Sequence, residues 1–247
     1  MSDVHERIRD WWDADAEHYD RSPGHALSDP VEAAAWRAAL REVLPETPVR
    51  VLDAGAGTGT LSLLAAELGH RVTSLDLSTG MLARAERKAE ERGLELEIVV
   101  GSVNEPPAGP FEVVIERHVI WTVPDPVGAL RAWRAVAADG GRLVLFEGIW
   151  APADPLGRAK VFAGGRLRSL RGEADHHHSS YPSDVLAQLP LAEMTSPLPL
   201  VDTVREAGWR GLRIKRLRDV EWAAKLHEPW PLGWLEQRQR YALIADA

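Results

Sequence analysis

The stretch that decides the fold is Val49–Thr60, VRVLDAGAGTGT. A short apolar run ends at Asp53, breaks into the alternating glycines Gly55, Gly57 and Gly59, and continues into an amphipathic segment. Glycines are needed where the backbone turns with a positive φ, or where a ligand approaches closer than a Cβ permits. The stretch therefore predicts a strand, a tight glycine turn and the start of a helix.

A second acidic residue, Asp76, ends the next apolar segment, HRVTSLD. It lies roughly 20 residues after the glycine turn, where an acid can accept hydrogen bonds from the hydroxyls of a ribose. A dinucleotide fingerprint would need a glycine in place of Thr60. The acid before the glycines, Asp53, suits a cationic or amino-bearing ligand better than a pyrophosphate. These residues predict a nucleoside-binding site.

The pattern from Asp53 to Gly59 resembles motif I of class I S-adenosylmethionine-dependent methyltransferases, and Asp76 resembles their ribose-binding acid. The alternative is a chance glycine-rich turn, which the flanking strands, the helix and Asp76 disfavour. The resemblance implies S-adenosylmethionine as cofactor and S-adenosylhomocysteine as product. It also implies a Rossmann-like α/β fold with a seven-stranded, mostly parallel sheet, whose seventh strand runs antiparallel beside the fifth.

Strand and helix signals alternate between residues 49 and 148, which predicts βαβ units and a parallel sheet with its ligand at the carboxyl ends of the strands. The run PDPVGALRAWRAVAADGG, residues 124–141, is expected to be one helix, followed by a fifth strand, RLVLFEG. A single domain is expected, with four parts: a helical cap (1–45), a cofactor-binding core (46–150), a lid (151–200), and C-terminal helices with strands six and seven (201–247).

Composition predicts a cytoplasmic enzyme. The 247 residues are 45% hydrophobic with no apolar run near the length of a membrane span, and the N-terminus is too charged for a signal peptide. A net charge of −8 argues against a large nucleic-acid-binding surface. The absence of cysteine excludes disulfides and thiolate metal sites. Neither a membrane nor a nucleic acid is expected as a partner, and the oligomeric state stays open.

The N-terminal part predicts two cap helices, the second beginning at Asp29-Pro30. Between them, Tyr19-Asp20 resembles a pair that closes over the cofactor in ubiquinone/menaquinone and natural-product methyltransferases. The alternative for Tyr19 is an aromatic residue packed under the cap.

The remaining cofactor positions follow the second and third strands. The family usually has Gly-Asp after the third strand to meet the adenine amino group, and this chain has Gly101-Ser102. The resemblance implies that Ser102 and the Val103 backbone contact the adenine, and that Leu77 and Met81 flank it. Both apolar residues are equally compatible with ordinary core packing.

The fourth strand ends at Glu116-Arg117-His118, where the family keeps part of its acceptor pocket. Arg117 suits the cofactor carboxylate or an anionic acceptor. His118 can act as a general base near neutral pH, with His25 as the other candidate; the alternative for His118 is a structural histidine. The Asn/Asp-Pro-Pro-Tyr motif of nucleobase methyltransferases is missing, which argues against a nucleobase acceptor.

Aromatic residues are expected to line the acceptor pocket. The candidates are Trp11, Trp12, Trp121 and Trp150. The run His176–His178, beside Asp175, is expected to be a solvated lid segment, because adjacent loop residues rarely all face one ion. No metal is predicted.

Together these features predict transfer of a methyl group from S-adenosylmethionine to a small, aromatic or apolar acceptor by in-line displacement at oxygen, nitrogen or carbon. Two alternatives remain. One is a cyclase on the same fold that binds the cofactor without methyl transfer, and the other is an aminopropyltransferase, which would need carboxylates along its acceptor site.

Overall fold

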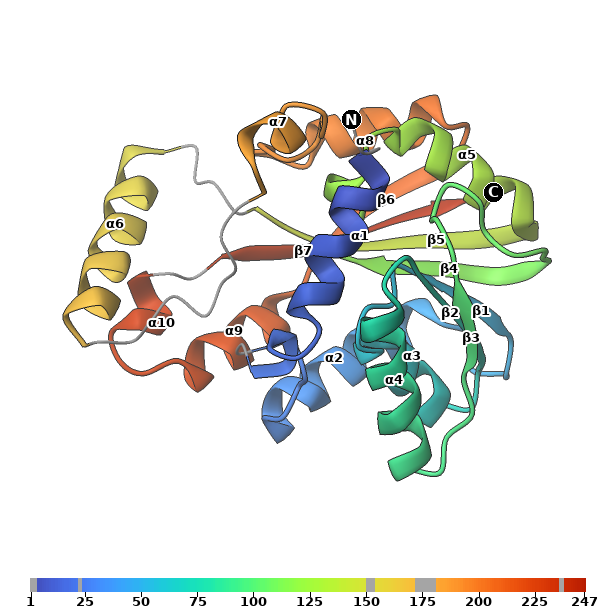
Figure 1. The fold of residues 1–247 in the computed structure, drawn as a ribbon, viewed down its shortest axis with the longest axis horizontal. Coiled ribbons are helices and arrows are strands. Elements are labelled where there is room, and N and C mark those ends of the chain that lie inside the picture. Colours follow the sequence, from blue (N-terminus) through green and yellow to red (C-terminus); the bar gives the residue numbers. More distant parts are fainter. Residues whose placement is uncertain (1–3, 22–23, 150–153, 172–180, 236–237) are drawn as a thin grey trace.

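The computed structural model describes residues 4–21, 24–149, 154–171, 181–235 and 238–247. Within them, seven strands form one sheet in the spatial order β3-β2-β1-β4-β5-β7-β6 (Figure 1). The strands are β1 Arg50–Ala54, β2 Arg71–Asp76, β3 Glu97–Val100, β4 Phe111–Arg117, β5 Ala137–Ile149, β6 Arg210–Arg216 and β7 Gln239–Asp246. β7 runs antiparallel to both β5 and β6, and the other pairs are parallel. The predicted sheet is confirmed.

Helices pack on both faces of this sheet. The helices are α1 Val4–Asp15, α2 Pro30–Val43, α3 Thr60–Glu67, α4 Thr79–Glu91, α5 Pro126–Val136, α6 Pro155–Leu170, α7 Ser183–Leu186, α8 Leu198–Glu206, α9 Arg218–His227 and α10 Leu232–Leu235. On one face, α5 and α8 bury side chains such as Trp133 and Leu200. On the other, α2, α3 and α9 bury Trp36, Leu64 and Val220.

The chain reverses its strand order next to β1, because β2 and β3 lie on one side of β1 and β4 on the other. In doubly wound sheets this reversal opens a crevice at the carboxyl ends of the strands. The glycine turn after β1 and the acid at the end of β2 both lie at that edge. The fold therefore brings the two sequence signals together.

The predicted helix over residues 124–141 is wrong at its C-terminal end. α5 begins after Asp125, whose side chain accepts a hydrogen bond from the Gly128 backbone at 2.9 Å, and it ends at Val136. Ala137 is extended, with ψ of 148°, and already belongs to β5. Gly140 adopts a φ of +69°, which a helix cannot accommodate, so the Ala-Ala-Asp-Gly-Gly run starts the strand.

The cap helices are present as predicted. Asp29 accepts hydrogen bonds from Val31 and Glu32, and Pro30 occupies the first turn of α2. In the view of Figure 1, α1 crosses the middle of the molecule, and it contacts α4.

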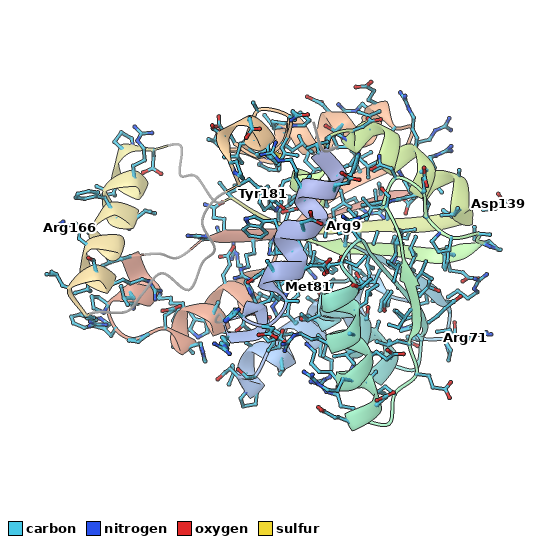
Figure 2. All side chains as sticks on the ribbon, in the orientation of Figure 1. Arg9, Arg71, Met81, Asp139, Arg166 and Tyr181 are labelled. Carbon is cyan, nitrogen blue, oxygen red and sulfur yellow. The ribbon has the colours of Figure 1, made fainter. Side chains whose placement is uncertain are left out.

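The expected lid contains a helix that its Pro, Gly and Ser content did not indicate. α6 begins at a cap by Asp154 and contacts α10, and Arg168 pairs with Glu228 at 2.8 Å. Figure 1 shows α6 standing away from the sheet, and Figure 2 places Arg166 on its outer side. Among the described residues, no helix combines the length and apolar character needed to span a membrane.

Candidate active site

A cavity that is partly open to solvent lies at the carboxyl ends of β1, β2 and β4. α1 contributes His5, Ile8 and Trp12 to its wall. Most of the predicted cofactor residues line it. These are Tyr19, Asp53, Gly55, Gly57, Asp76, Leu77, Met81, Ser102, Val103 and Arg117. His118 lines the same cavity, so the predicted nucleoside site and the predicted acceptor site are continuous.

The three glycines of the turn all have positive φ, but they serve different purposes. A Cβ on Gly55 would collide with the Val119 side chain, and a Cβ on Gly59 would come within 2.7 Å of the Ala85 Cβ. A Cβ on Gly57 would meet no protein atom within 4 Å. Gly57 is therefore the glycine that leaves space in the cavity itself, while the other two allow close packing.

Asp76 ties the glycine turn to the start of α4. Its Oδ2 accepts a hydrogen bond from the Gly57 backbone at 2.8 Å, and its Oδ1 accepts one from the Ser78 backbone at 2.9 Å. Burial raises the pKa of Asp76, and these backbone hydrogen bonds oppose the increase. Hydroxyl groups of a ligand would donate further hydrogen bonds to this buried carboxylate and stabilise its ionised form.

Asp53 is almost fully buried beneath the turn. Its Oδ2 accepts a hydrogen bond from Ser62 Oγ at 2.6 Å, and Ser74 Oγ donates to Ser62 Oγ at 2.8 Å. Burial raises the pKa of Asp53 to about 6, while Ser62 and the more distant Arg117 oppose the increase. A cationic ligand group beside Asp53 would lower this pKa and so favour the ionised carboxylate.

The side of the cavity where the sequence predicts the adenine combines apolar and polar groups. Met81 is 2% exposed, so it is core and cavity wall at once. Ser102 Oγ accepts a hydrogen bond from the Asn104 backbone at 3.2 Å, and the Val103 carbonyl accepts one from Trp133 Nε1 at 2.6 Å. These bonds fix the backbone that borders the cavity after β3.

We call residues 13–21 and 24–25 the cap segment. Asp13 accepts a hydrogen bond from Ser78 Oγ at 2.5 Å. Asp20 accepts one from Thr58 Oγ1 at 2.7 Å and pairs with Lys88 Nζ at 3.1 Å. The cap segment is thus bonded to the glycine turn and to both ends of α4.

The cap segment also meets the end of β4. Tyr19 stacks on the His25 ring at a centroid distance of 4.1 Å, and Thr60 Oγ1 donates to the His25 carbonyl at 2.5 Å. Arg117 Nη1 donates to the Gly24 carbonyl at 3.1 Å while its guanidinium lies 5.2 Å from the centre of a Trp36 ring. Tyr19 lines the cavity, whereas His25 is not among its lining residues.

His118 follows β4 in a left-handed conformation, with φ of +62°. Its Nδ1 lies 3.2 Å from Glu147 Oε2, and it lines the cavity. Burial lowers the pKa of His118 well below the ordinary 6.5, and the nearby Arg240 and Arg117 lower it further. The sequence predicts that His118 ionises near neutral pH, whereas this environment lowers its pKa below that range.

Sequence reasoning gave no role to two buried glutamates beside His118, Glu116 and Glu147. Glu116 Oε2 accepts hydrogen bonds from the Val119 backbone at 2.8 Å and the Ile120 backbone at 3.3 Å. Burial raises the pKa of Glu116 to about 8 and that of Glu147 well above its ordinary value. A glutamate inside an otherwise apolar strand, as in LVLFEG, is the signal that could have identified Glu147.

The predicted tryptophans divide into two groups. Trp12 lines the cavity, whereas Trp11 and Trp121 are not among its lining residues. Trp11 and Trp121 pack against Tyr181, with ring centroids 4.9 Å and 6.0 Å away. Figure 2 labels Tyr181 and Met81 on either side of α1. Trp150 lies outside the described residues.

Metal ligands were not expected. In the part of the chain that the structure describes, no three His, Asp or Glu side chains gather in a way that could hold an ion. The run His176–His178 and its neighbour Asp175 lie outside that part.

Comparison with known proteins adds to this geometry. Residues 52–145 match a family described as a methyltransferase domain. The ubiquinone biosynthesis O-methyltransferase of Xanthomonas campestris pv. campestris (strain B100) is 33% identical over 226 residues, which cover 89% of this chain and 80% of that protein.

Two solved structures have the same fold. The geranyl diphosphate C-methyltransferase from Streptomyces coelicolor A3(2) has a TM-score of 0.64 at 17% identity, covering 100% of this chain and 98% of that one. The 4+2 cyclase SpnF has a TM-score of 0.65 at 16% identity, covering 99% and 97%. At such identities these likenesses bear on the fold alone.

Proposed function

This chain belongs to the class I S-adenosylmethionine-dependent methyltransferases, and we propose that it methylates an oxygen of a small aromatic or apolar acceptor. One observation carries the acceptor proposal. The cavity lined by the motif residues continues, without a break, to His118 and to Trp12 of the cap. The oxygen nucleophile is proposed from the name of the relative that matches 89% of this chain.

We propose that the motif residues hold the cofactor as follows. Asp76 accepts the ribose hydroxyls, Asp53 faces the amino group of the methionine part, and Arg117 faces its carboxylate. The adenine lies among the residues after β2 and β3, which are Leu77, Met81, Ser102 and Val103. The space at Gly57 supports this fit, because only a glycine there leaves the cavity open.

The bound cofactor supplies an electrophilic methyl group on a sulfonium, which already has a good leaving group. The protein then has to align the acceptor with the carbon–sulfur bond and exclude water. The aromatic side chains of the cap segment and α1, Tyr19 and Trp12, are suited to cover an apolar acceptor. An aminopropyltransferase would need ionised carboxylates at this end, whereas burial favours the protonated forms of Glu116 and Glu147.

The test is incubation with methyl-labelled S-adenosylmethionine and a panel of hydroxylated aromatic compounds, alongside a metabolite extract. Label in an O-methylated product supports the proposal, with Gly57→Val as the control that should not bind cofactor. Conversion of an extract component without transfer of label would favour the cyclase alternative. Label on nitrogen or carbon only would overturn the choice of oxygen.

A further inference from the structure

Helix α6 carries only basic charges. Between residues 155 and 171 the chain has no aspartate or glutamate, although its net charge is −8. The basic residues of this stretch are Arg158, Lys160, Arg166, Arg168 and Arg171. Figure 1 shows that α6 stands away from the sheet, so this positive charge is presented at one end of the molecule.

The outward side of α6 combines one of these cations with apolar side chains. Phe162, Arg166 and Leu170 recur at every fourth position, so they lie along one stripe of the helix. Figure 2 places Arg166 on the outer side of α6, and Phe162 and Leu170 are 71% and 80% exposed. Within the described residues, Arg166 forms no ion pair. The stripe therefore exposes a positive charge between two large apolar side chains.

An exposed tryptophan lies beside the C-terminal end of that stripe. Arg171, which follows Leu170, donates through Nη2 to the Trp230 carbonyl at 3.2 Å, and the Trp230 side chain is 79% exposed. Glu228 pairs with Arg168 at 2.8 Å, so its negative charge is compensated. The basic helix and the exposed aromatic ring are therefore neighbours.

Two further exposed tryptophans flank a lysine on α9 and α10. Lys225 Nζ lies 2.8 Å from the centre of a Trp234 ring and 4.6 Å from the centre of a Trp222 ring. Both rings are more than half exposed. Tryptophan is enriched where a protein surface meets an apolar phase and water together. We call these exposed side chains the lobe surface, and its residues are Phe162, Arg166, Leu170, Trp222, Trp230 and Trp234.

The charge of α6 decides between the partners that such an apolar surface fits. In a two-fold symmetric dimer the same surface meets itself, so α6 would face an equally basic helix. An anionic phospholipid bilayer offers the opposite charge together with an apolar phase, and it attracts surface helices that combine Lys and Arg with Trp, Phe and Leu. The sequence predicts no membrane partner because no apolar run is long enough to span a bilayer. A helix that lies on a bilayer needs no such run.

We propose that the lobe surface docks on an anionic phospholipid bilayer, with its aromatic rings at the level of the head groups and Arg166 beside lipid phosphates. The lobe surface lies at the same edge of the sheet as the cavity. α6 follows β5, and α10 precedes β7, whose Gln239 pairs with Ile149 at the carboxyl end of β5. A bilayer also dissolves apolar acceptors, a consequence that rests on the proposed function, whereas the docking itself does not.

The first experiment sediments the full chain with vesicles of phosphatidylcholine and phosphatidylglycerol in equal parts, and with vesicles of phosphatidylcholine alone. We expect binding to the anionic vesicles to be at least about 10-fold tighter. Salt at about 1 M should remove most of this difference, because it shortens the screening length to about 3 Å. Equal binding to both kinds of vesicle, or no binding to the anionic ones, would overturn the proposal.

Two variants of α6 test the charged and the apolar parts of the lobe surface separately. Arg166→Glu replaces a positive charge by a negative one and should weaken binding to the anionic vesicles about 30-fold, which corresponds to about 2 kcal/mol. The double variant Phe162→Ala with Leu170→Ala should weaken it about 10-fold. Because all three side chains are exposed, both variants should melt at the temperature of the wild type.

The matched controls are Arg71→Glu and Leu198→Ala. Figure 2 shows Arg71 at the opposite end of the molecule from Arg166, and Leu198 is an exposed residue of α8. Neither control should change vesicle binding. A loss in Arg71→Glu as large as that in Arg166→Glu would mean that net charge alone sets the affinity, and the lobe surface would then have no special part in it.

The second experiment measures self-association by analytical ultracentrifugation without lipid. We expect the wild type and both α6 variants to have the same oligomeric state. A dimer that disappears in both variants, in a chain that does not bind vesicles, would assign the lobe surface to a second copy and refute the docking on lipid. Neither experiment uses turnover, so failure here leaves methyl transfer intact, and an absence of methyl transfer leaves vesicle binding measurable.

Discussion

Gly57→Ala tests the cofactor site without disturbing the packing around it. Gly57 has a φ of +54°, so any Cβ there strains the backbone by about 1–2 kcal/mol. No protein atom lies within 4 Å of that Cβ, and the added methyl group projects into the cavity. We therefore expect a modest loss of stability and a larger loss of cofactor affinity.

The matched control is Gly59→Ala, two residues away in the same turn. Gly59 has a φ of +81°, so the backbone strain is comparable, but its Cβ would come within 2.7 Å of the Ala85 Cβ. Overpacking of this kind adds about 1–3 kcal/mol to the loss of stability. If the Gly57→Ala methyl group overpacks a bound nucleoside at the same free-energy cost, the dissociation constant of the nucleoside rises roughly 5- to 150-fold.

The assay pairs calorimetric titration of S-adenosylhomocysteine with denaturant unfolding of each free variant. Gly57→Ala should lose more affinity and less stability than Gly59→Ala. The reasoning fails if Gly57→Ala binds with wild-type affinity, or if the two variants lose affinity and stability in the same proportion.

Three further outcomes are expected. Asp76→Ala should weaken the binding of S-adenosylhomocysteine about 10- to 150-fold, which is the scale of a lost charge-assisted hydrogen bond. If the ribose contact is responsible, calorimetry should show that the same substitution does not weaken the binding of a 2′,3′-dideoxy analogue. His118→Ala should slow methyl transfer about 100-fold while leaving cofactor affinity unchanged, and a parallel fall in melting temperature and activity would indicate a structural role instead. Glu116→Gln should flatten the pH dependence of stability. Because the pKa of Glu116 is raised from 4.5 to about 8, the folded protein keeps a proton that the unfolded chain releases. The wild type should therefore lose stability as the pH rises from 4.5 to about 8. Urea titrations at several pH values would contradict the assignment if the wild type and Glu116→Gln show the same change of stability with pH.

The features predicted correctly are those encoded over short stretches of chain. Gly57 and Asp76 lie 19 positions apart in sequence and are joined by a hydrogen bond, because βαβ topology places consecutive strand ends side by side. A local pattern of glycines, an acid and two apolar strands is enough to specify that arrangement.

The features missed depend on distant parts of the chain. Glu147 meets His118 only because β5 lies beside β4. Tyr181 meets Trp11 of α1 and Trp121 of the turn after β4 only because the chain just before α7 packs against both. Arg7 of α1 and Asp184 of α7 form an ion pair at 2.5 Å, which also joins two distant parts of the sequence. Such pairs follow from tertiary packing and leave no trace in periodicity or spacing.

The cap segment has a consequence for the rate of the catalytic cycle. Asp13 and Asp20 bond directly to the glycine turn and to α4, which border the cavity, so these contacts narrow the route by which a bound nucleoside leaves. In enzymes where a segment of the chain covers part of the site, product release commonly limits turnover. We expect S-adenosylhomocysteine to dissociate slowly, and Asp20→Asn, which weakens the pairing with Lys88, to accelerate its dissociation in stopped-flow displacement. An unchanged dissociation rate would mean that the nucleoside leaves by a path that the cap segment does not obstruct.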